Sequence, residues 1–426
     1  MTCILTSKQA GELHKSMIAY LSSVNAIQSV AVLEKELPVD ITFNDVARKK
    51  YEGLLARKWT NVMRLQRRIL DLESRVSNLE SKLENVAPVG VGGTPKSCLP
   101  DMHATHTLQS HRAAISCIAF HPVHPSIASA SDDFSIKIWN REVGTLEYTL
   151  NGHLRPVLGL DFGRPQRRTL LASCSNDLTI KIWDPNNCYS NVRTLYGHDD
   201  SVSAVRFLTT TGTLLVSASR DASIRIWDAL TGYCVRSIHT EGNWIRDISP
   251  SFDGACLVVG GNDRTATVWE TSSGQPKATL SGHESYIECC TFAPASSHLY
   301  LGGLIPTAVL GVSLRGSSFI ATGSRDKSIK IWNDTGILIK TLVGHEGWVR
   351  GLAFHPSGRY LASVGDDRTI RIWDLLQDGQ LVNTFDGFSD HFITCVRWGP
   401  KQINQDLDIS YVLGTGGADS SVRIWL

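Results

Sequence analysis

The chain has 426 residues, with 42 Lys and Arg against 41 Asp and Glu, so its formal net charge is only +1. This balance argues against nucleic acid as a partner, and no apolar run reaches the roughly 20 residues that a membrane-spanning helix requires. The ten cysteines include no C-x-x-C pair, which indicates neither a zinc site nor a disulfide framework. We therefore expect a soluble intracellular protein that needs no metal or cofactor, does not bind nucleic acid and does not insert into a membrane.

The first segment, residues 1–40, carries apolar residues at helical spacing over 7–22 and 26–37, which predicts two short amphipathic helices. A hairpin of this size buries too little surface to be stable alone, so self-association is expected. The segment resembles the LisH dimerisation motif.

Residues 41–87 are predicted to form a helix and a short coiled coil. The heptad positions that carry the prediction are Val62, Leu65, Ile69, Leu72, Val76, Leu79 and Leu83. Mostly β-branched residues at a with Leu at d favour a parallel two-stranded coil, hence a homodimer. The alternative is a single amphipathic helix packed on the rest of the chain. The Pro- and Gly-rich residues 88–102 are expected to form a flexible linker with a reach of ~20 Å.

Residues 103–426 contain a repeat of about 42 residues. Each of seven units ends in a strand-like segment such as IKIW, and an Asp stands six residues before its Trp. These residues are Asp133, Asp177, Asp221, Asp263, Asp326, Asp367 and Asp419, with Trp139, Trp183, Trp227, Trp269, Trp332, Trp373 and Trp425. A Ser or Thr follows two residues after each Asp, and most units carry Gly-His upstream.

This pattern resembles the WD40 repeat, which implies a mainly β fold with seven four-stranded blades arranged as a propeller. In that fold His, Ser/Thr, Asp and Trp form a hydrogen-bonded chain inside each blade. Because a catalytic triad is not needed seven times, we interpret these residues as a structural network rather than an active site. The Ile-Lys-Ile-Trp strand is expected to place Ile and Trp on one face and Lys on the other.

Two units depart from the repeat. Alignment puts Glu241 in the fourth unit and Ser389 in the seventh at the position of the histidine. The chain also ends one residue after Trp425, so residues 103–108 are expected to supply the outer strand of the last blade. An apolar insertion, residues 296–318, lies in the fifth unit; disorder or packing beneath the propeller is one interpretation, and a second partner site is the other.

Several segments, among them KKYEGLLARKWTNVMRLQRRILDLESRVSNLESKL and IKTLVGHEGWVRGLAFHP, are similar to the lissencephaly-1 family, called NudF or Pac in fungi. The resemblance implies a fungal, non-catalytic regulator of cytoplasmic dynein that acts in nuclear migration, spindle positioning and microtubule-based transport. The implied partners are the dynein heavy chain motor domain, a NudE-type coiled-coil adaptor and, indirectly, microtubules. The implied location is the cytoplasm and the cytoskeleton, including the spindle pole.

The repeat positions that reach the top face of a WD40 propeller hold many Arg and aromatic residues, a composition typical of protein-binding hot spots. The expected dynein-binding residues are Arg220, Arg246, Arg325, Trp348, Arg350 and Arg368, and further top-face residues are Trp244, Arg264, Tyr286, Lys327 and Phe392. Solvated turn charges beside partly buried aromatic rings are the structural alternative. Two other functions remain open: a non-catalytic subunit of a phospholipid-mediator acetylhydrolase, and a WD40 scaffold or substrate receptor.

Overall fold

The computed structural model describes residues 99–100 and 103–426, except 210–211, 241–243, 305–317, 388, 401 and 404–408, together with Met17 and Leu21. The chain divides into two compact units, Met1–Pro95 and Lys96–Leu426. Met17 and Leu21, in the first predicted helix, are helical. The rest of the LisH segment, the heptad positions from Val62 to Leu83 and most of the predicted linker lie outside the described residues.

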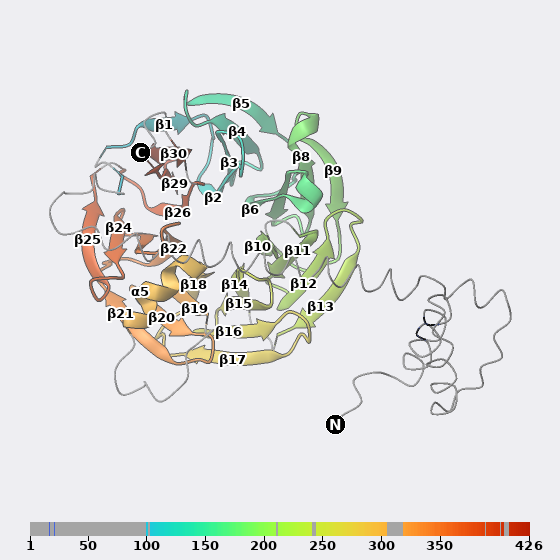
Figure 1. Cartoon of the computed structure of the whole chain (residues 1–426). Coiled ribbons are helices and arrows are strands. Elements are labelled where there is room, and N and C mark those ends of the chain that lie inside the picture. The colour runs from blue at the N-terminus through green and yellow to red at the C-terminus, as the bar shows by residue number, and fades with distance from the viewer. Residues whose placement is uncertain are drawn as a thin grey trace, which may run out of the picture. The chain divides into compact units, whose positions relative to one another are not determined.

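The second unit is a propeller of seven four-stranded antiparallel sheets around a central axis (Figure 1). Blade one consists of β2 (Ile115–Phe120), β3 (Ser126–Ser131), β4 (Ile136–Asn140) and β5 (Thr145–Leu150). Blade two consists of β6 (Val157–Gly163), β7 (Leu170–Ser175), β8 (Ile180–Asp184) and β9 (Ser190–Leu195). Blade three consists of β10 (Val202–Phe207), β11 (Leu214–Ser219), β12 (Ser223–Asp228) and β13 (Cys234–His239). Blade four consists of β14 (Ile245–Pro250), β15 (Cys256–Gly261), β16 (Thr265–Glu270) and β17 (Pro276–Ser281). Blade five consists of β18 (Ile287–Phe292), β19 (Phe319–Ser324), β20 (Ser328–Asn333) and β21 (Leu338–Val343). Blade six consists of β22 (Val349–Phe354), β23 (Tyr360–Gly365), β24 (Ile370–Asp374) and β25 (Gln380–Phe385).

The seventh blade joins the two ends of this unit. Its inner strands are β26 (Ile393–Trp398), β29 (Leu413–Gly417) and β30 (Ser421–Trp425), and its outer strand is β1 (His106–Gln109). β1 pairs antiparallel with β30, with His106 opposite Ile424. This confirms that the segment before the first repeat completes the last blade and so closes the ring.

Each hydrophobic core lies between two neighbouring blades. One cluster joins Ile136 and Ile138 of blade one to Leu160 and Trp183 of blade two, and the same arrangement recurs around the ring. Leu99, inside the predicted linker, packs against the cluster shared by blades six and seven. Since inner strands are covered on both faces, they are buried almost throughout, whereas outer strands such as β5 are mostly exposed.

The expected separation of Lys from Trp in the Ile-Lys-Ile-Trp strand is wrong. A Cβ placed on Gly152 would lie 3.2 Å from the Trp183 ring and 3.9 Å from the side chain of Lys181. Lys181 and Trp183 therefore lie on one face of β8, because residues two apart in a strand point the same way. The Lys181 ammonium donates to Thr194 on the outer strand at 3.1 Å.

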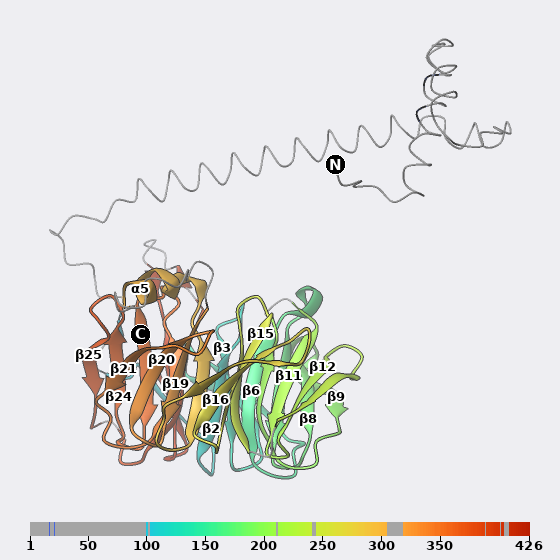
Figure 2. The same ribbon diagram turned by 90° about the horizontal axis from the view of Figure 1, so that it is seen from below.

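The remaining elements are short. They are η1 (Pro165–Arg167), η2 (Pro185–Asn187), η3 (Ala295–Ser297), α5 (His298–Gly303) and the two-stranded sheet of β27 (Gln402–Ile403) and β28 (Ile409–Ser410). α5 begins the apolar insertion of blade five and lies at one end of the propeller (Figure 2), where Leu301 is fully buried against Phe319. Residues 305–317 of the insertion lie outside the described part of the chain. No helix in the described ranges is long and apolar enough to cross a bilayer.

Candidate protein-binding surface

A buried hydrogen-bonded chain runs through five of the blades. In blade one, His111 Nδ1 lies 2.8 Å from the Asp133 carboxylate, His111 Nε2 lies 2.8 Å from Ser129 Oγ, and the Trp139 indole donates to Ser129 Oγ at 2.8 Å. The same chain is built on His153, His198, His283 and His345. These imidazoles are 0–1% exposed. Their burial and repetition support the structural interpretation.

The hydroxyl in this chain differs from the one that the sequence singled out. The Ser or Thr two residues after the Asp does not bridge His and Trp: Ser135, for example, donates to Asp133 at 2.6 Å and lies 3.4 Å from His111 Nδ1. The bridging hydroxyl stands ten residues before the Trp, on the second strand of the blade. These residues are Ser129, Ser173, Ser217, Thr322 and Ser363.

The turn Asp organises the loop above this network. The Asp133 carboxylate accepts the backbone N–H groups of Arg112 and Ser135, both at 3.0 Å. Burial alone would raise the pKa of Asp133, but hydrogen bonds from Ser135, Arg112 and His111 outweigh it and lower the pKa to about 2. Burial conversely lowers the pKa of His111.

Blades four and seven lack this network in part, as the missing histidines predict. In blade seven, Ser389 and Arg423 both donate to Asp419, at 3.1 and 2.6 Å, and the Trp425 indole donates to Thr415 at 3.1 Å. In blade four, Val259 replaces the bridging hydroxyl. Within the described ranges, the buried Trp269 indole N–H consequently has no hydrogen-bond partner. Glu241 itself lies outside the described residues.

Eight of the eleven predicted top-face residues form an arc of guanidinium groups and aromatic rings across blades three to seven. Stacking joins Arg220 to Trp244 and, separately, runs from Arg246 to Phe392. The stacked pairs and their distances from guanidinium carbon to ring centroid are Arg220–Trp244 at 5.4 Å, Arg246–Tyr286 at 5.5 Å, Arg325–Tyr286 at 5.2 Å, Arg325–Trp348 at 4.0 Å, Arg350–Trp348 at 5.0 Å and Arg350–Phe392 at 5.7 Å. We call these eight residues the arginine–aromatic arc. Its four rings are 36–50% exposed, so a partner has access to them.

The carboxylate of Glu288 lies among the arginines at the centre of this arc. Glu288, whose side chain is 9% exposed, lies 3.1 Å from Arg246 and accepts a hydrogen bond from Arg325 Nε. Arg350 lies 3.9 Å from Glu288 and forms a two-pronged pair with Asp366 at 2.7 and 3.1 Å. The sequence places Glu288 and Asp366 on this face but does not indicate their pairing. The arginines are thus fixed in position and only partly neutralised.

The other three predicted residues lie apart from these contacts. Arg264, Lys327 and Arg368 each follow a turn Asp and adopt positive φ angles of 64–69°. Their exposure leaves them available to a partner, but no stacking contact joins them to the arc. The arc itself surrounds a hollow of about 380 Å³ at the mouth of the central channel, lined in part by Asp132, Arg220, Arg246 and Arg350.

Seven blades closed into a ring, five of which hold this buried His–Asp–Ser/Thr–Trp chain, define a WD40 β-propeller. The model for the WD domain, G-beta repeat, matches residues 102–140, 144–184, 189–228, 232–270, 274–304, 307–333, 336–374 and 379–425. Blade five is matched in two parts because the insertion separates its first two strands. The model for the PAC1 LisH domain matches residues 7–42.

Relatives that match the chain over its full length include fungal nuclear distribution proteins. The chain is 54% identical over 446 residues to nuclear distribution protein PAC1-1 of Uncinocarpus reesii, 54% over 445 residues to nuclear distribution protein nudF of Aspergillus niger and 52% over 443 residues to nudF of Emericella nidulans. Each comparison covers 100% of both chains. The chain belongs to the PAC1/nudF family of nuclear distribution proteins.

Proposed function

We propose that this chain is a non-catalytic regulator of cytoplasmic dynein that binds the motor domain through the arginine–aromatic arc. Such a regulator would support nuclear migration, spindle positioning and transport along microtubules, in the cytoplasm and on the cytoskeleton. Relatives that match the whole chain are named for nuclear distribution. The observation that carries the proposal is the arc itself, which offers guanidinium groups and exposed rings on a rigid scaffold.

The physical chemistry of the arc favours an acidic partner surface. Three of its four arginines share only two carboxylates, Glu288 and Asp366, so cationic capacity remains after internal pairing. The guanidinium groups of Arg246, Arg325 and Arg350 are 21–26% exposed and already ordered by stacking, which lowers the entropic cost of binding carboxylates. Interfacial charges of this kind steer association and make its rate sensitive to salt.

The proposal includes a homodimer, formed through the LisH segment and the heptad positions from Val62 to Leu83. Two propellers on one stalk would act as a bivalent clamp, in which a second contact gains from an effective concentration of about millimolar. A NudE-type adaptor is the second proposed partner, and microtubules are reached indirectly through dynein. Arg264, Lys327 and Arg368 are proposed as additional contacts at the edge of the same face.

The rival functions predict different partners. A non-catalytic acetylhydrolase subunit would bind the catalytic esterase subunits, and a general scaffold would bind neither these nor dynein. The apolar insertion of blade five remains a candidate second partner site, with residues 305–317 outside the described range.

Binding of the purified full-length chain to an isolated dynein motor domain tests the proposal. The test variant carries Arg220→Ala, Arg325→Ala and Arg350→Ala. A matched variant removes three cations from outer strands, through Arg193→Ala, Lys277→Ala and Lys340→Ala. We expect the arc variant to lose at least about tenfold in affinity and the matched variant to bind as wild type does. Equal binding by both variants would contradict the placement, and binding of esterase subunits without dynein would favour the rival.

A further inference from the structure

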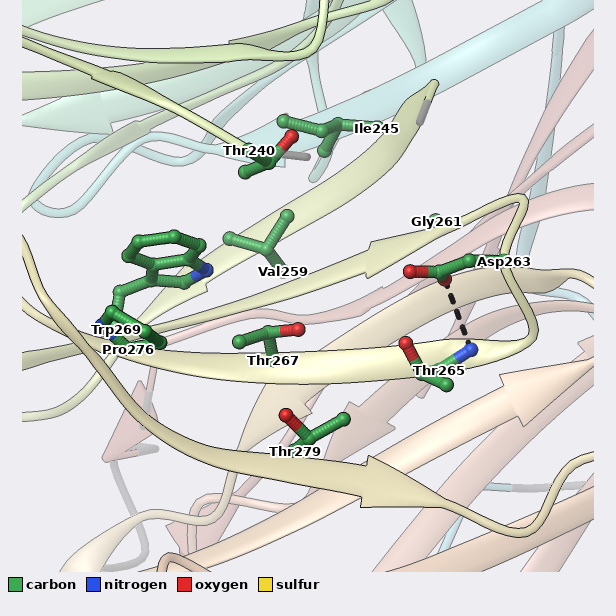
Figure 3. Close-up of a pocket in the computed structure, with 10 residues that line it drawn as sticks. All are labelled: Thr240, Ile245, Val259, Gly261, Asp263, Thr265, Thr267, Trp269, Pro276 and Thr279. Atoms are coloured by element: carbon green, nitrogen blue, oxygen red, sulfur yellow. Dashed lines mark hydrogen bonds between the residues drawn. The ribbon is translucent and has the colours of Figure 1, made fainter. Parts of the chain in front are cut away.

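Blade four contains a cavity where the other blades hold part of their network. The cavity has a volume of about 340 Å³ and is lined by Thr240, Ile245, Val259, Gly261, Asp263, Thr265, Thr267, Trp269, Pro276 and Thr279 (Figure 3). This volume lies in the range of roughly 300–1,000 Å³ that is common for small-ligand sites. The described lining includes one carboxylate and no Lys, Arg or His.

Two substitutions, each visible in the register of the sheet, leave this space open. Val259 stands opposite Thr267, at the position of the bridging hydroxyl. Thr267 itself stands opposite Thr279, where other blades pair a strand cation with a Thr: Lys137 with Thr149, Lys181 with Thr194 and Lys330 with Thr341. All six other blades carry Lys or Arg at the position of Thr267, namely Lys137, Lys181, Arg225, Lys330, Arg371 and Arg423.

Among the described residues, Asp263 has no ion-pair partner, whereas each of the six other turn carboxylates pairs with a His or an Arg. In blade six, for example, Asp367 meets both His345 at 2.7 Å and Arg371 at 3.7 Å. The Asp263 side chain accepts the backbone N–H of Thr265 at 3.0 Å, as the dashed line in Figure 3 marks. Asp263 is exposed, whereas the turn carboxylates of the six other blades are only 6–17% exposed.

The opposite end of the cavity offers a donor. Trp269 is 9% exposed, and among the described residues its indole N–H has no hydrogen-bond partner. Figure 3 shows the indole nitrogen on the cavity side of the ring, with Val259 and Thr267 between it and the Asp263 carboxylate. A buried donor without an acceptor destabilises the fold, so an acceptor brought in by a ligand would recover free energy on binding.

We propose that the blade-four cavity is a binding site for a cationic ligand of the guanidinium or ammonium class. The cation pairs with Asp263, and an oxygen of the same ligand accepts the Trp269 indole N–H. Threonine hydroxyls supply further hydrogen bonds, and Ile245, Val259 and Pro276 contact the alkyl part. The site is separate from the proposed dynein-binding function, because it lies within one blade and uses none of the arc's eight residues.

The test measures the binding of Nα-acetyl-arginine-amide to the full-length protein by isothermal titration calorimetry. The uncharged control ligand is Nα-acetyl-citrulline-amide, which has nearly the same shape. We expect saturable binding of the arginine compound and at least tenfold weaker binding of the citrulline compound. A blocked Gly-Arg-Gly peptide identifies the source: tighter binding than the amide indicates a peptide side chain, and equal binding indicates a free small cation.

Variants separate the site from general surface charge. Asp263→Asn should weaken binding at least tenfold, and Thr267→Lys should abolish it by filling the cavity with the residue type that other blades carry. Glu270→Gln, an exposed carboxylate on the same blade outside the cavity, should leave binding unchanged. In protein labelled with ¹⁵N-tryptophan, the ligand should shift the indole N–H signal that Trp269→Phe removes.

Three results would overturn the proposal. They are no saturable binding to wild type, equal binding of the citrulline compound, and unchanged affinity in Asp263→Asn. Thr267→Lys introduces a residue type that other blades carry at the same position. A thermal midpoint and a near-UV spectrum like those of wild type would show that the variant is folded, so that a loss of binding is not a loss of folding.

Discussion

The guanidinium carbon of Arg325 lies 4.0 Å from the centroid of the Trp348 ring, the shortest cation–π contact among the described residues of the propeller. The same ring also contacts Arg350 from the next blade, at 5.0 Å. Trp348 is therefore held between two arginines of different blades while 36% of it stays exposed. A ring fixed in this way contacts a partner at little cost in conformational entropy, which is typical of a binding hot spot.

Trp348→Ala should weaken binding to the dynein motor domain by about 10- to 100-fold, or roughly 1.4–2.7 kcal/mol. The fold should persist because the ring lies at the surface, and the thermal midpoint checks this. Leu154→Ala is the control, since Leu154 is 81% exposed and follows the network histidine of blade two. An affinity unchanged by Trp348→Ala would remove the ring from the interface.

Glu288→Ala should destabilise the propeller by about 1–3 kcal/mol, because it leaves partly buried arginines without their shared acceptor. Glu288→Gln keeps the shape and one acceptor oxygen, so its loss should be smaller. Urea unfolding of the two variants measures the difference. If both were as stable as wild type, the carboxylate would not be what orders Arg246 and Arg325.

Two tryptophans at equivalent positions should respond differently to the same change. Trp332→Phe breaks the indole hydrogen bond to Thr322, which is 2.8 Å long, within a complete network, and should cost about 1–3 kcal/mol. Trp269→Phe removes a donor that has no partner among the described residues, so its cost should be below about 1 kcal/mol. Equal losses in denaturant unfolding would mean that the blade-four indole is satisfied after all.

The buried network should make the propeller sensitive to acid. The pKa of Asp133 is about 2 in the folded protein and about 3.9 in an unfolded chain. A depressed folded pKa adds stability above about pH 4 and loses it as the pH falls towards 2. Asp133→Asn should thus be less stable than wild type at pH 7, and the gap should shrink between pH 4 and 2. A gap that stays constant in urea titrations would contradict the proposed role of the charge.

The repeat could be predicted from the sequence because its signals are local. The Asp turn, the strand before Trp139 and the segment that became β1 are each set by a few neighbouring residues. Most residues of the arc could be predicted from the same local patterns, because the fold brings equivalent repeat positions to one face. The missing histidines also predicted incomplete networks in blades four and seven.

The contacts that local sequence patterns could not predict are those that form between blades in the closed ring. Glu288 meets Arg246 and Arg350, which are 42 and 62 residues away in the chain. One signal was present, because these three residues occupy the same position of successive units and the acidic one stands between two arginines. Ser129 was missed for another reason: a small polar residue in a buried strand looks like ordinary core until its Trp and His partners are placed.

The salt dependence of the proposed binding to the dynein motor domain tests whether the arginine–aromatic arc is the docking surface. Dissociation constants would be measured for wild type, the three-arginine arc variant and the matched outer-strand variant at about 50 and about 300 mM NaCl, which changes the Debye length about 2.5-fold. We predict that salt weakens the affinity of wild type and of the matched variant by the same factor. The arc variant should bind weakly at both concentrations, with little further change in affinity. Tight binding by the arc variant with an undiminished salt dependence would show that the partner docks elsewhere on the propeller.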